Sequence, residues 1–285
     1  MKIGVVGSGM MGSEIALTFA LANHELRLSD AAEDRLAVAT KNIATTLDKG
    51  VARQLWQEMD AKRALGQIHT TDKLADYADC DVVIEAVSED EAIKAAVFRQ
   101  LDKICRDGCL ITSNTSSISI SVLASYLSPA RRGNFLGTHF FSPVSRMKLV
   151  EVIPGIDTDP RAVEEAKTLC RSAGKTPIQV KDVVGFAVNR LLHALLIEAT
   201  RLAEEGVADP ADIDTACKLG LGHPVGPFEL MDLVSNTLTL QVQEVLLAAY
   251  GERFRPSMLL KKMVKSGYDG RKVGRGWLRW DKKTR

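Results

Sequence analysis

The chain has 285 residues, which is enough for one large core or two ordinary domains. Hydrophobic residues make up 46% of it and charged residues 26%, a composition typical of globular proteins. Because 37 Lys and Arg residues balance 36 Asp and Glu residues, no overall basic field points to a nucleic-acid partner, and no apolar run is long enough to suggest a membrane-spanning segment.

The first two thirds of the chain alternate short β-branched runs with helical stretches. Strands are predicted at residues 2–6, 25–29, 81–86, 110–113, 134–139, 148–153 and 177–181. Helical stretches are predicted at residues 11–23, 33–65, 91–105 and 161–173. Nearly continuous apolar strands that alternate with helices favour a mostly parallel sheet covered on both faces, so residues 1–183 are predicted to form an α/β domain of the Rossmann type.

The pattern changes near residue 184. A helix with a wide apolar stripe is predicted over residues 186–205, with Gly206 as its stop. Asp209 and Pro210 are predicted to begin the next helix as N-cap and first residue, and helices continue to about residue 264. We therefore expect an all-helical second domain over residues 184–285. Its apolar stripe can serve the core alone or a dimer interface as well.

The N-terminus and the cysteines indicate the compartment. Met1 and Lys2 lead directly into the first strand, with no charged region or cleavage site of a signal peptide. The cysteines form no Cys-x-x-Cys pair and no even disulfide framework; they are Cys80, Cys105, Cys109, Cys170 and Cys217. We expect a reduced, cytoplasmic protein that holds no metal.

A glycine-rich turn joins the first strand to the first helix. It consists of Gly7, Ser8, Gly9, Met10, Met11 and Gly12, and it has the Gly-x-Gly-x-x-Gly spacing of dinucleotide-binding proteins. Gly7 permits the tight turn, Gly9 lets the backbone approach a pyrophosphate, and Gly12 lets helix and strand pack closely. Free N–H groups at the helix start favour an anion. The sequence therefore predicts a dinucleotide site here, although such glycines also occur in ordinary turns.

Asp30 ends the second predicted strand. A carboxylate at this place accepts hydrogen bonds from the adenosine ribose and repels a 2′-phosphate. NAD is therefore the expected cofactor, rather than NADP. The alternative is that Asp30 only caps the helix that follows it.

Seven further motifs follow in chain order. They are 83–89 (VIEAVSE) with Lys94, 113–117 (SNTSS), 138–143 (THFFSP), 147–152 (MKLVEV), 185–190 (GFAVNR), 222–229 (GHPVGPFE) and 270–276 (GRKVGRG). Together they resemble the 3-hydroxyacyl-CoA dehydrogenase family in its small two-domain form, over essentially the whole chain. The resemblance implies an NAD-dependent oxidoreductase that acts on the 3-hydroxyl of a short acyl-thioester, and a homodimer formed through the helical domain.

His139 is the candidate general base. Hydride removal from a secondary alcohol requires a group that takes the hydroxyl proton, and histidine titrates near neutrality. Glu151 lies 12 positions later in the next predicted strand, where it can fix the imidazole tautomer and stabilise the imidazolium. The resemblance matches both residues to the family's His–Glu pair, and it adds Ser116, near the reacting oxygen and the nicotinamide, and Asn189, which orients the substrate. Ser116 alone can equally be a helix cap, and Asn189 a surface amide.

The resemblance also places four residues beside the cofactor: Glu89, Lys94, Ser142 and Lys272. Lys94 is expected near the ribose, and Lys272 as a clamp over the cofactor. The alternatives without a cofactor role are an ion pair between Glu89 and Lys94 and a solvent-exposed basic cluster at residues 271–272.

The resemblance implies that Thr46, Lys49 and Arg53 contact the CoA phosphates and that Ser116 lies on the substrate side. Arg53 stands where the family has lysine, and the family's Lys-Gly-Lys run is absent. Ser142 replaces the family's asparagine, Arg146 is inserted before Met147, and residues 235–237 (SNT) replace Gly-Leu-Asp. These polar departures suggest a polar acyl group or an acyl-carrier protein in place of CoA. A dehydrogenase of a free hydroxy or sugar acid, and a non-enzymatic dinucleotide-binding protein, are the remaining alternatives.

Overall fold

A computed structural model describes residues 1–280 of the chain. The chain divides between Val183 and Val184 into two compact units, and each has its own hydrophobic core. None of the helices within residues 1–280 is both long enough and apolar enough to cross a membrane.

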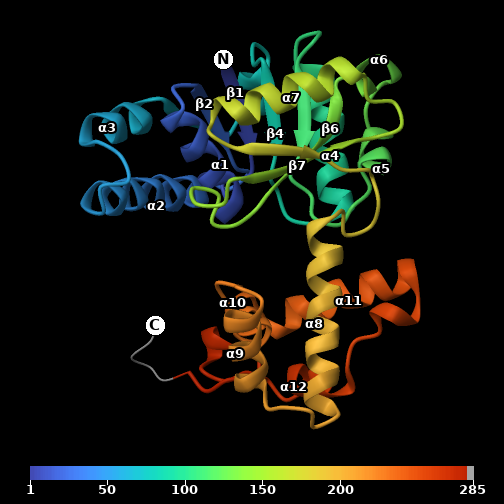
Figure 1. The fold of residues 1–285 in the computed structure, drawn as a ribbon. Helices are drawn as coiled ribbons and strands as arrows, with labels where there is room; N and C mark the ends of the chain where they lie inside the picture. The colour runs from blue at the N-terminus through green and yellow to red at the C-terminus, as the bar shows by residue number, and fades with distance from the viewer. Residues whose placement is uncertain (281–285) are drawn as a thin grey trace. The chain divides into compact units, whose positions relative to one another are not determined.

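The first unit contains one eight-stranded sheet with the order β3-β2-β1-β4-β5-β6-β7-β8 (Figure 1). The strands are β1 (Lys2–Val6), β2 (Glu25–Ser29), β3 (Ile68–Thr71), β4 (Val82–Glu85), β5 (Leu110–Ser113), β6 (Phe135–Phe140), β7 (Leu149–Pro154) and β8 (Thr176–Gln179). Neighbouring strands are parallel except β6 and β7, which run antiparallel. The predicted Rossmann-type α/β fold is confirmed. The edge strand β3 was not predicted, because its four residues are partly exposed and carry no apolar run.

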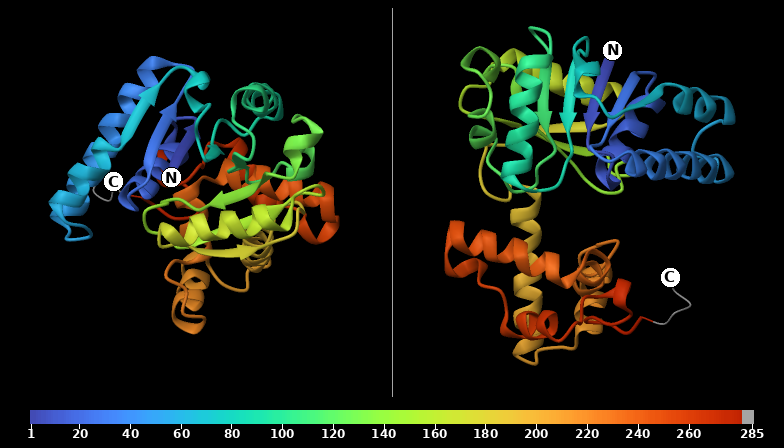
Figure 2. Two further views of the ribbon diagram at one scale, coloured as in Figure 1. Left: turned by 90° about the horizontal axis from the view of Figure 1, so that it is seen from above. Right: turned by 180° about the vertical axis from the view of Figure 1, so that it is seen from behind.

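Helices cover both faces of this sheet (Figure 2). They are α1 (Met10–Leu21), α2 (Glu33–Ala52), α3 (Glu58–Gly66), α4 (Glu91–Ile104), α5 (Ile120–Ala124), α6 (Pro129–Arg132) and α7 (Pro160–Ser172). Helices α1, α2 and α7 share one apolar cluster with the strands. On α4, the Phe98 ring meets the Phe135 ring of β6 edge-on, with centroids 5.0 Å apart.

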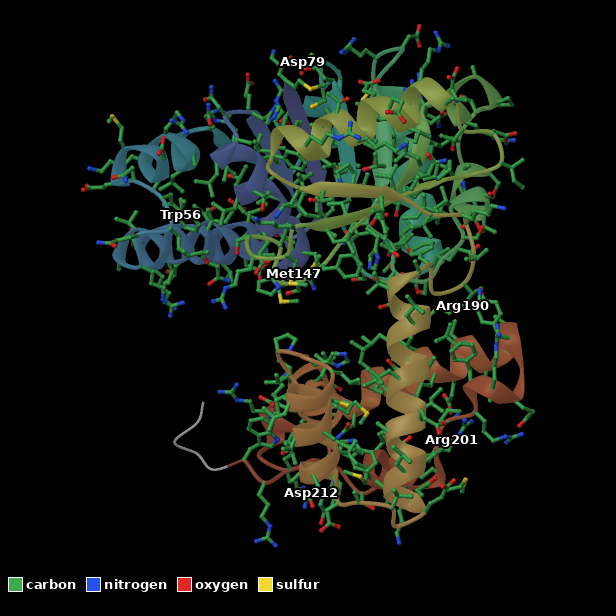
Figure 3. All side chains as sticks on the ribbon, in the orientation of Figure 1. Trp56, Asp79, Met147, Arg190, Arg201 and Asp212 are labelled. Carbon is green, nitrogen blue, oxygen red and sulfur yellow. The ribbon has the colours of Figure 1, made fainter. Side chains whose placement is uncertain are left out.

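The helical stretch predicted over residues 33–65 is two helices, α2 and α3. The turn between them contains Gln54 with a positive φ of 58°. Trp56, labelled in Figure 3, closes the turn. Its ring packs against Gly50, and its Nε1 donates to the Leu47 carbonyl at 3.0 Å. The sequence did not reveal this break because residues 53–57 contain no Pro or Gly, and the turn depends instead on how the Trp56 side chain packs back on α2.

The second unit is helical within the described residues, as predicted. Its helices are α8 (Val188–Glu204), α9 (Pro210–Gly220), α10 (Pro227–Val234), α11 (Asn236–Tyr250) and α12 (Met258–Lys265). Pro210 is the first residue of α9 and Asp209 is its N-cap, although the Asp209 side chain makes no capping bond. Leu196, Phe228 and Met231 form the centre of one apolar cluster.

Asp232 fastens the segment after α12 to this core. Its buried carboxylate accepts from Trp277 N and Leu278 N at 2.9 Å each and from Trp280 Nε1 at 2.8 Å. The fully buried Asn236 donates to Asp232 and accepts from Trp277 Nε1 at 2.9 Å. A buried polar network of this kind holds the segment because each of these donors would otherwise lack a partner.

Candidate active site

The glycine-rich turn between β1 and α1 has the geometry of a dinucleotide site. Gly7 has a φ of 102°, which only glycine adopts readily, and a Cβ on Gly12 would lie 1.8 Å from the Gly7 carbonyl oxygen. Gly9 is the N-cap of α1 and has no side chain to occupy the helix start. A Cβ on Gly9 would meet no described atom within 4 Å, so the backbone there is open to a ligand. The first turn of α1 therefore fits the NAD pyrophosphate.

Asp30 stands at the end of β2 beside this turn. Its Oδ2 accepts from Ser8 N at 2.9 Å and from Ser8 Oγ at 3.0 Å, and its Oδ1 lies 3.9 Å from Arg35 Nη1. Burial raises the pKa of Asp30, but the hydrogen bonds from Ser8 outweigh burial, and the pKa falls below its ordinary value. The carboxylate is therefore ionised at neutral pH.

A pocket of about 480 Å³ extends from the glycine turn along the sheet edge. Asp30 and Gly9 contribute to one side of it, and Leu74, Ile93 and Val97 give it an apolar wall. This combination of a carboxylate and an apolar wall suits an adenosine, whose ribose is polar and whose base is flat and largely apolar.

His139 and Glu151 occupy directly opposite positions on the antiparallel strands β6 and β7. His139 Nδ1 lies 2.8 Å from Glu151 Oε2; the glutamate is fully buried and the histidine is 5% exposed. On the other side of the imidazole, Nε2 lies 3.0 Å from Ser116 Oγ. The three side chains form a continuous chain from carboxylate to imidazole to hydroxyl. Such an arrangement can take a proton from a hydroxyl placed at Nε2.

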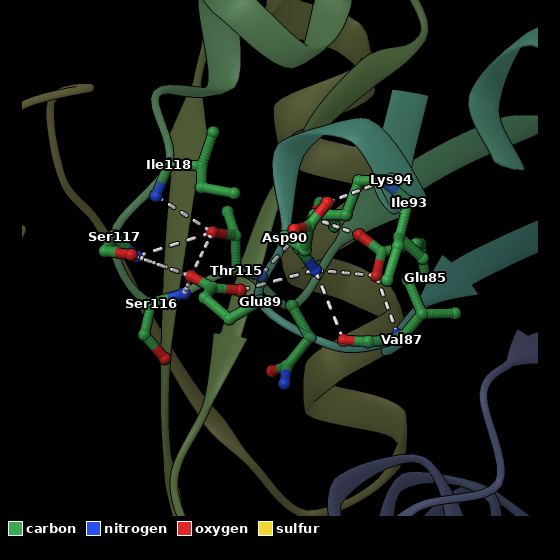
Figure 4. A network of polar contacts seen from close by, with 12 residues as sticks. Glu85, Val87, Glu89, Asp90, Ile93, Lys94, Thr115, Ser116, Ser117 and Ile118 are labelled. Carbon is green, nitrogen blue, oxygen red and sulfur yellow. Dashed lines mark hydrogen bonds and ion pairs between the residues drawn. The ribbon is translucent and has the colours of Figure 1, made fainter. Parts of the chain in front are cut away.

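Glu89 holds the turn that carries Ser116 (Figure 4). One carboxylate oxygen, Oε1, accepts from Ser116 N at 2.8 Å, from Ser117 N at 2.9 Å and from Thr115 Oγ1 at 2.6 Å. Burial raises the pKa of Glu89, but Lys94 and these hydrogen bonds lower it below its usual value. Glu89 is therefore an anion that fixes the backbone on which Ser116 sits.

Lys94 is enclosed in the protein and is only 1% exposed. Its Nζ lies 2.7 Å from Glu85 Oε1 and 3.4 Å from Glu89 Oε2 (Figure 4). Burial raises the pKa of Glu85, and the Lys94 ammonium opposes that shift. The alternative ion pair between Glu89 and Lys94 is present, and Glu85 is a second partner of the ammonium. The expected place of Lys94 near the cofactor ribose stays a prediction. Glu85 was not predicted from the sequence as a partner of Lys94. The signal was visible, because Glu85 ends the apolar strand β4, where a carboxylate needs a buried partner.

The predicted CoA contacts follow one stripe of α2. Thr46, Lys49 and Arg53 are spaced three and four residues apart, which places them on one side of the helix. Thr46 also lines a pocket of about 400 Å³ between α1 and α2, together with Glu14 and Asn42. Lys49 and Arg53 lie farther along the stripe on the exposed surface.

Ser142 lies beside the start of α1, with its Oγ 4.0 Å from Met10 Sδ. Asn189 and Lys272 belong to the second unit, where Asn189 is half-buried in the first turn of α8 and Lys272 is exposed in a short 3₁₀ helix. No group of His, Cys, Asp or Glu side chains within residues 1–280 could hold a metal ion.

Residues 235–237, which had suggested a polar substrate, have structural partners. Ser235 Oγ caps α11 by accepting from Leu238 N, and it donates to Asp269 at 2.8 Å. Asn236 is fully buried in the Asp232 network. Ser235 and Asn236 therefore have structural partners, and a substrate contact by residues 235–237 stays a prediction.

Comparison with known proteins agrees with this geometry along the whole chain. The family model for the NAD binding domain of 3-hydroxyacyl-CoA dehydrogenase matches residues 2–183, and the model for the C-terminal domain of that family matches residues 185–280. A probable 3-hydroxybutyryl-CoA dehydrogenase of Deinococcus radiodurans is 39% identical, over 98% of this chain and 100% of that protein.

Two further relatives are similar to the same extent. The mitochondrial hydroxyacyl-coenzyme A dehydrogenase of Homo sapiens is 37% identical, over 98% of this chain and 90% of that protein. The crystal structure of (S)-3-hydroxybutyryl-CoA dehydrogenase from Ralstonia eutropha superposes with a TM-score of 0.94 at 38% identity, and 99% of each chain is covered.

Proposed function

Since the chain belongs to the 3-hydroxyacyl-CoA dehydrogenase family and is an NAD-dependent CH–OH oxidoreductase, we propose that it oxidises the 3-hydroxyl of a short acyl-CoA such as 3-hydroxybutyryl-CoA, or catalyses the reverse reduction. The observation that carries this proposal is the Glu151–His139–Ser116 chain, with distances of 2.8 Å and 3.0 Å. The relatives whose names include 3-hydroxybutyryl-CoA support a short acyl group.

His139 acts as the general base in this mechanism. Its Nδ1 donates to the Glu151 carboxylate, which leaves Nε2 as the acceptor for the 3-hydroxyl proton. Glu151 then stabilises the imidazolium that forms. Ser116 Oγ, which lies at Nε2, positions the reacting oxygen. When bound, NAD supplies the acceptor for the hydride from C3. General-base catalysis of this kind contributes roughly 10²- to 10⁴-fold to the rate.

The cofactor contacts that we propose lie along the carboxyl ends of β1, β2 and β4. Residues 7–12 hold the pyrophosphate, Asp30 holds the adenosine ribose, and Glu89 lies on the nicotinamide side. Ser142 and Lys272 complete the proposed set. Lys94 acts on the cofactor through Glu89, because its ammonium is enclosed between Glu85 and Glu89.

On the substrate side, we propose that Thr46, Lys49 and Arg53 contact the CoA moiety and that Asn189 orients the acyl group. Ser142, Arg146 and residues 235–237 are the polar departures that suggest a polar acyl group or an acyl-carrier protein. The second unit is the proposed substrate and dimerisation domain, and its exposed Leu191, 74% accessible on α8, supports an apolar contact between two copies. A cytoplasmic location accords with five unpaired, buried thiols.

The experiment that tests the function follows NADH formation with 3-hydroxybutyryl-CoA, beside the same acid free and attached to an acyl-carrier protein. Turnover of the CoA ester is expected. His139→Gln should reduce kcat by at least roughly 10²-fold while NADH still binds. No turnover of the CoA ester, together with turnover of the free acid, would overturn the proposed substrate class.

A further inference from the structure

One loop joins the two strands that carry His139 and Glu151. This connecting loop, residues 141–148, begins two residues after His139 and ends three residues before Glu151. Any displacement of the loop pulls on the ends of β6 and β7, where the two side chains pair. How the loop is fastened to the rest of the unit therefore bears on the geometry of the pair.

Glu14 fastens the connecting loop to α1. Its Oε2 accepts a hydrogen bond from the backbone N–H of Val144. Glu14 lies in the second turn of α1, two residues after Gly12, so the helix whose start faces the proposed pyrophosphate site also holds the middle of the loop. Ser142, two residues before Val144, approaches Met10 at the start of the same helix.

Lys175 fastens the loop from the other side. Its Nζ donates to the Val144 carbonyl and, at 3.0 Å, to the Met147 carbonyl; Figure 3 labels Met147. The residue is only 8% exposed, and burial lowers the pKa of Lys175 while the nearby Cys170 and Glu14 oppose that shift. Lys175 is itself fixed, because Thr176 N donates to the Lys148 carbonyl at 2.7 Å where β8 joins β7.

The chemistry of these contacts argues for positioning and not only for packing. A buried ammonium is costly, and an apolar side chain of similar length would fill the same space without that cost. What an apolar side chain cannot do is bind two carbonyl groups of one loop at once. Both contacts meet at Val144: its N–H donates a hydrogen bond to Glu14, and its carbonyl accepts one from Lys175.

We propose that Glu14 and Lys175 are positioning residues for the dehydrogenase reaction: they clamp the connecting loop at Val144 so that His139 and Glu151 stay opposed and Ser142 stays beside the start of α1. This proposal rests on the proposed function of His139. In this proposal, Glu14 and Lys175 act through the loop and do not contact the reacting atoms. Because the clamp joins the cofactor helix to the loop of the catalytic pair, its loss should lower kcat more than it weakens cofactor binding.

The test uses four variants of the full chain. Lys175→Met removes both carbonyl contacts, and Glu14→Ala removes the acceptor for Val144 N. Glu14→Gln keeps an acceptor oxygen and serves as the conservative variant. The control is Lys167→Met, which removes a lysine whose Nζ binds Glu164 and Gln179 and does not contact the loop.

Activity is measured with 3-hydroxybutyryl-CoA and expressed per NADH-binding site, so that unfolded protein is not counted. Lys175→Met should lower kcat by roughly 10- to 100-fold, the cost of a small misplacement in an active site. Glu14→Ala should lower kcat less, Glu14→Gln should recover most of that loss, and Lys167→Met should match the wild type. If Lys175→Met does not fold, the comparison of Glu14→Ala with Glu14→Gln still tests the clamp.

Hydrogen exchange at the Val144 amide supplies a readout that does not depend on the substrate. Exchange there should accelerate in Glu14→Ala and Lys175→Met and remain slow in Glu14→Gln and Lys167→Met. Unchanged kcat per site, or unchanged exchange at Val144, in both Glu14→Ala and folded Lys175→Met would overturn the clamp. If the wild type does not turn over the CoA ester but the variants show the expected pattern of exchange at Val144, the proposed substrate is contradicted and the clamp is still supported.

Discussion

His139 Nδ1 lies 2.8 Å from Glu151 Oε2, and antiparallel pairing of β6 and β7 sets the two residues directly opposite each other. Glu151→Gln keeps the shape of the partner but removes the charge that stabilises an imidazolium. We expect kcat to fall by roughly 10²- to 10⁴-fold with NADH affinity nearly unchanged. Steady-state kinetics with an NADH titration measures both quantities. Glu165→Gln on the exposed side of α7 is the matched control, and equal kcat in the two variants would remove Glu151 from the mechanism.

Ser116→Ala removes the hydroxyl that lies 3.0 Å from His139 Nε2. Glu89 holds the Ser116 backbone through its amide, so the turn should keep its shape in the variant. The loss should be that of one hydrogen bond to a group that becomes charged, about 1.5–3 kcal/mol, or roughly 10- to 100-fold in kcat/KM. Ser125→Ala is the control, at an exposed serine that follows α5, and it should leave kcat/KM unchanged. A Ser116 variant as active as Ser125→Ala would contradict the role.

We expect Asp30 and Arg35 together to set the preference for NAD over NADP. The ionised Asp30 repels a 2′-phosphate, and Arg35 Nη1 lies 3.9 Å from Asp30 Oδ1. Asp30→Ala should weaken NAD binding and free Arg35 to pair with the 2′-phosphate of NADP, so the preference for NAD should narrow by roughly 10- to 100-fold. The ratio of kcat/KM for the two cofactors measures it. Adding Arg35→Ala should abolish the gain for NADP; if NADP use persists without Arg35, the arginine has no part in it.

Much of this site could be predicted because its residues stand at strand ends in a regular α/β pattern. The spacing of residues 7–12, Asp30 after the second strand, and His139 and Glu151 on neighbouring strands are all visible along the sequence. What joins distant segments is not visible. The Glu85–Lys94 pair and the Lys175 contacts to Val144 and Met147 depend on side chains that cross between elements. No periodicity marks such a residue as buried, because a charged side chain is usually expected at the surface.

Ser235 and Asn236 show that polarity interpreted from the sequence as a substrate contact can also have a structural use. Ser235 caps a helix and Asn236 completes a buried network around Asp232. Their side chains accept hydrogen bonds from backbone and indole N–H groups that would otherwise lack partners. Composition at a loop therefore cannot separate a substrate contact from a structural one until the loop's own partners are known.

His193 on α8 should make the stability of the second unit depend on pH. The side chain is 5% exposed, its Nδ1 has no hydrogen-bond partner within residues 1–280, and burial lowers the pKa of His193 to about 4. In the unfolded chain a histidine binds a proton below about pH 6.5. Between about pH 6.5 and 4 the unfolded state therefore binds more protons, and the free energy of unfolding should fall by roughly 1.4 kcal/mol for each unit that the pH drops.

His193→Leu removes both the titration and the unpaired nitrogen. Urea unfolding near pH 7 and near pH 5 should show a smaller loss of stability on acidification in this variant than in the wild type. At the lower pH the variant should be more stable by about 1–3 kcal/mol. His69→Leu, at an exposed position on β3, is the control and should follow the wild type. If His193→Leu loses stability on acidification as steeply as the wild type does, His193 is not the group that titrates, and the dependence must come from other residues.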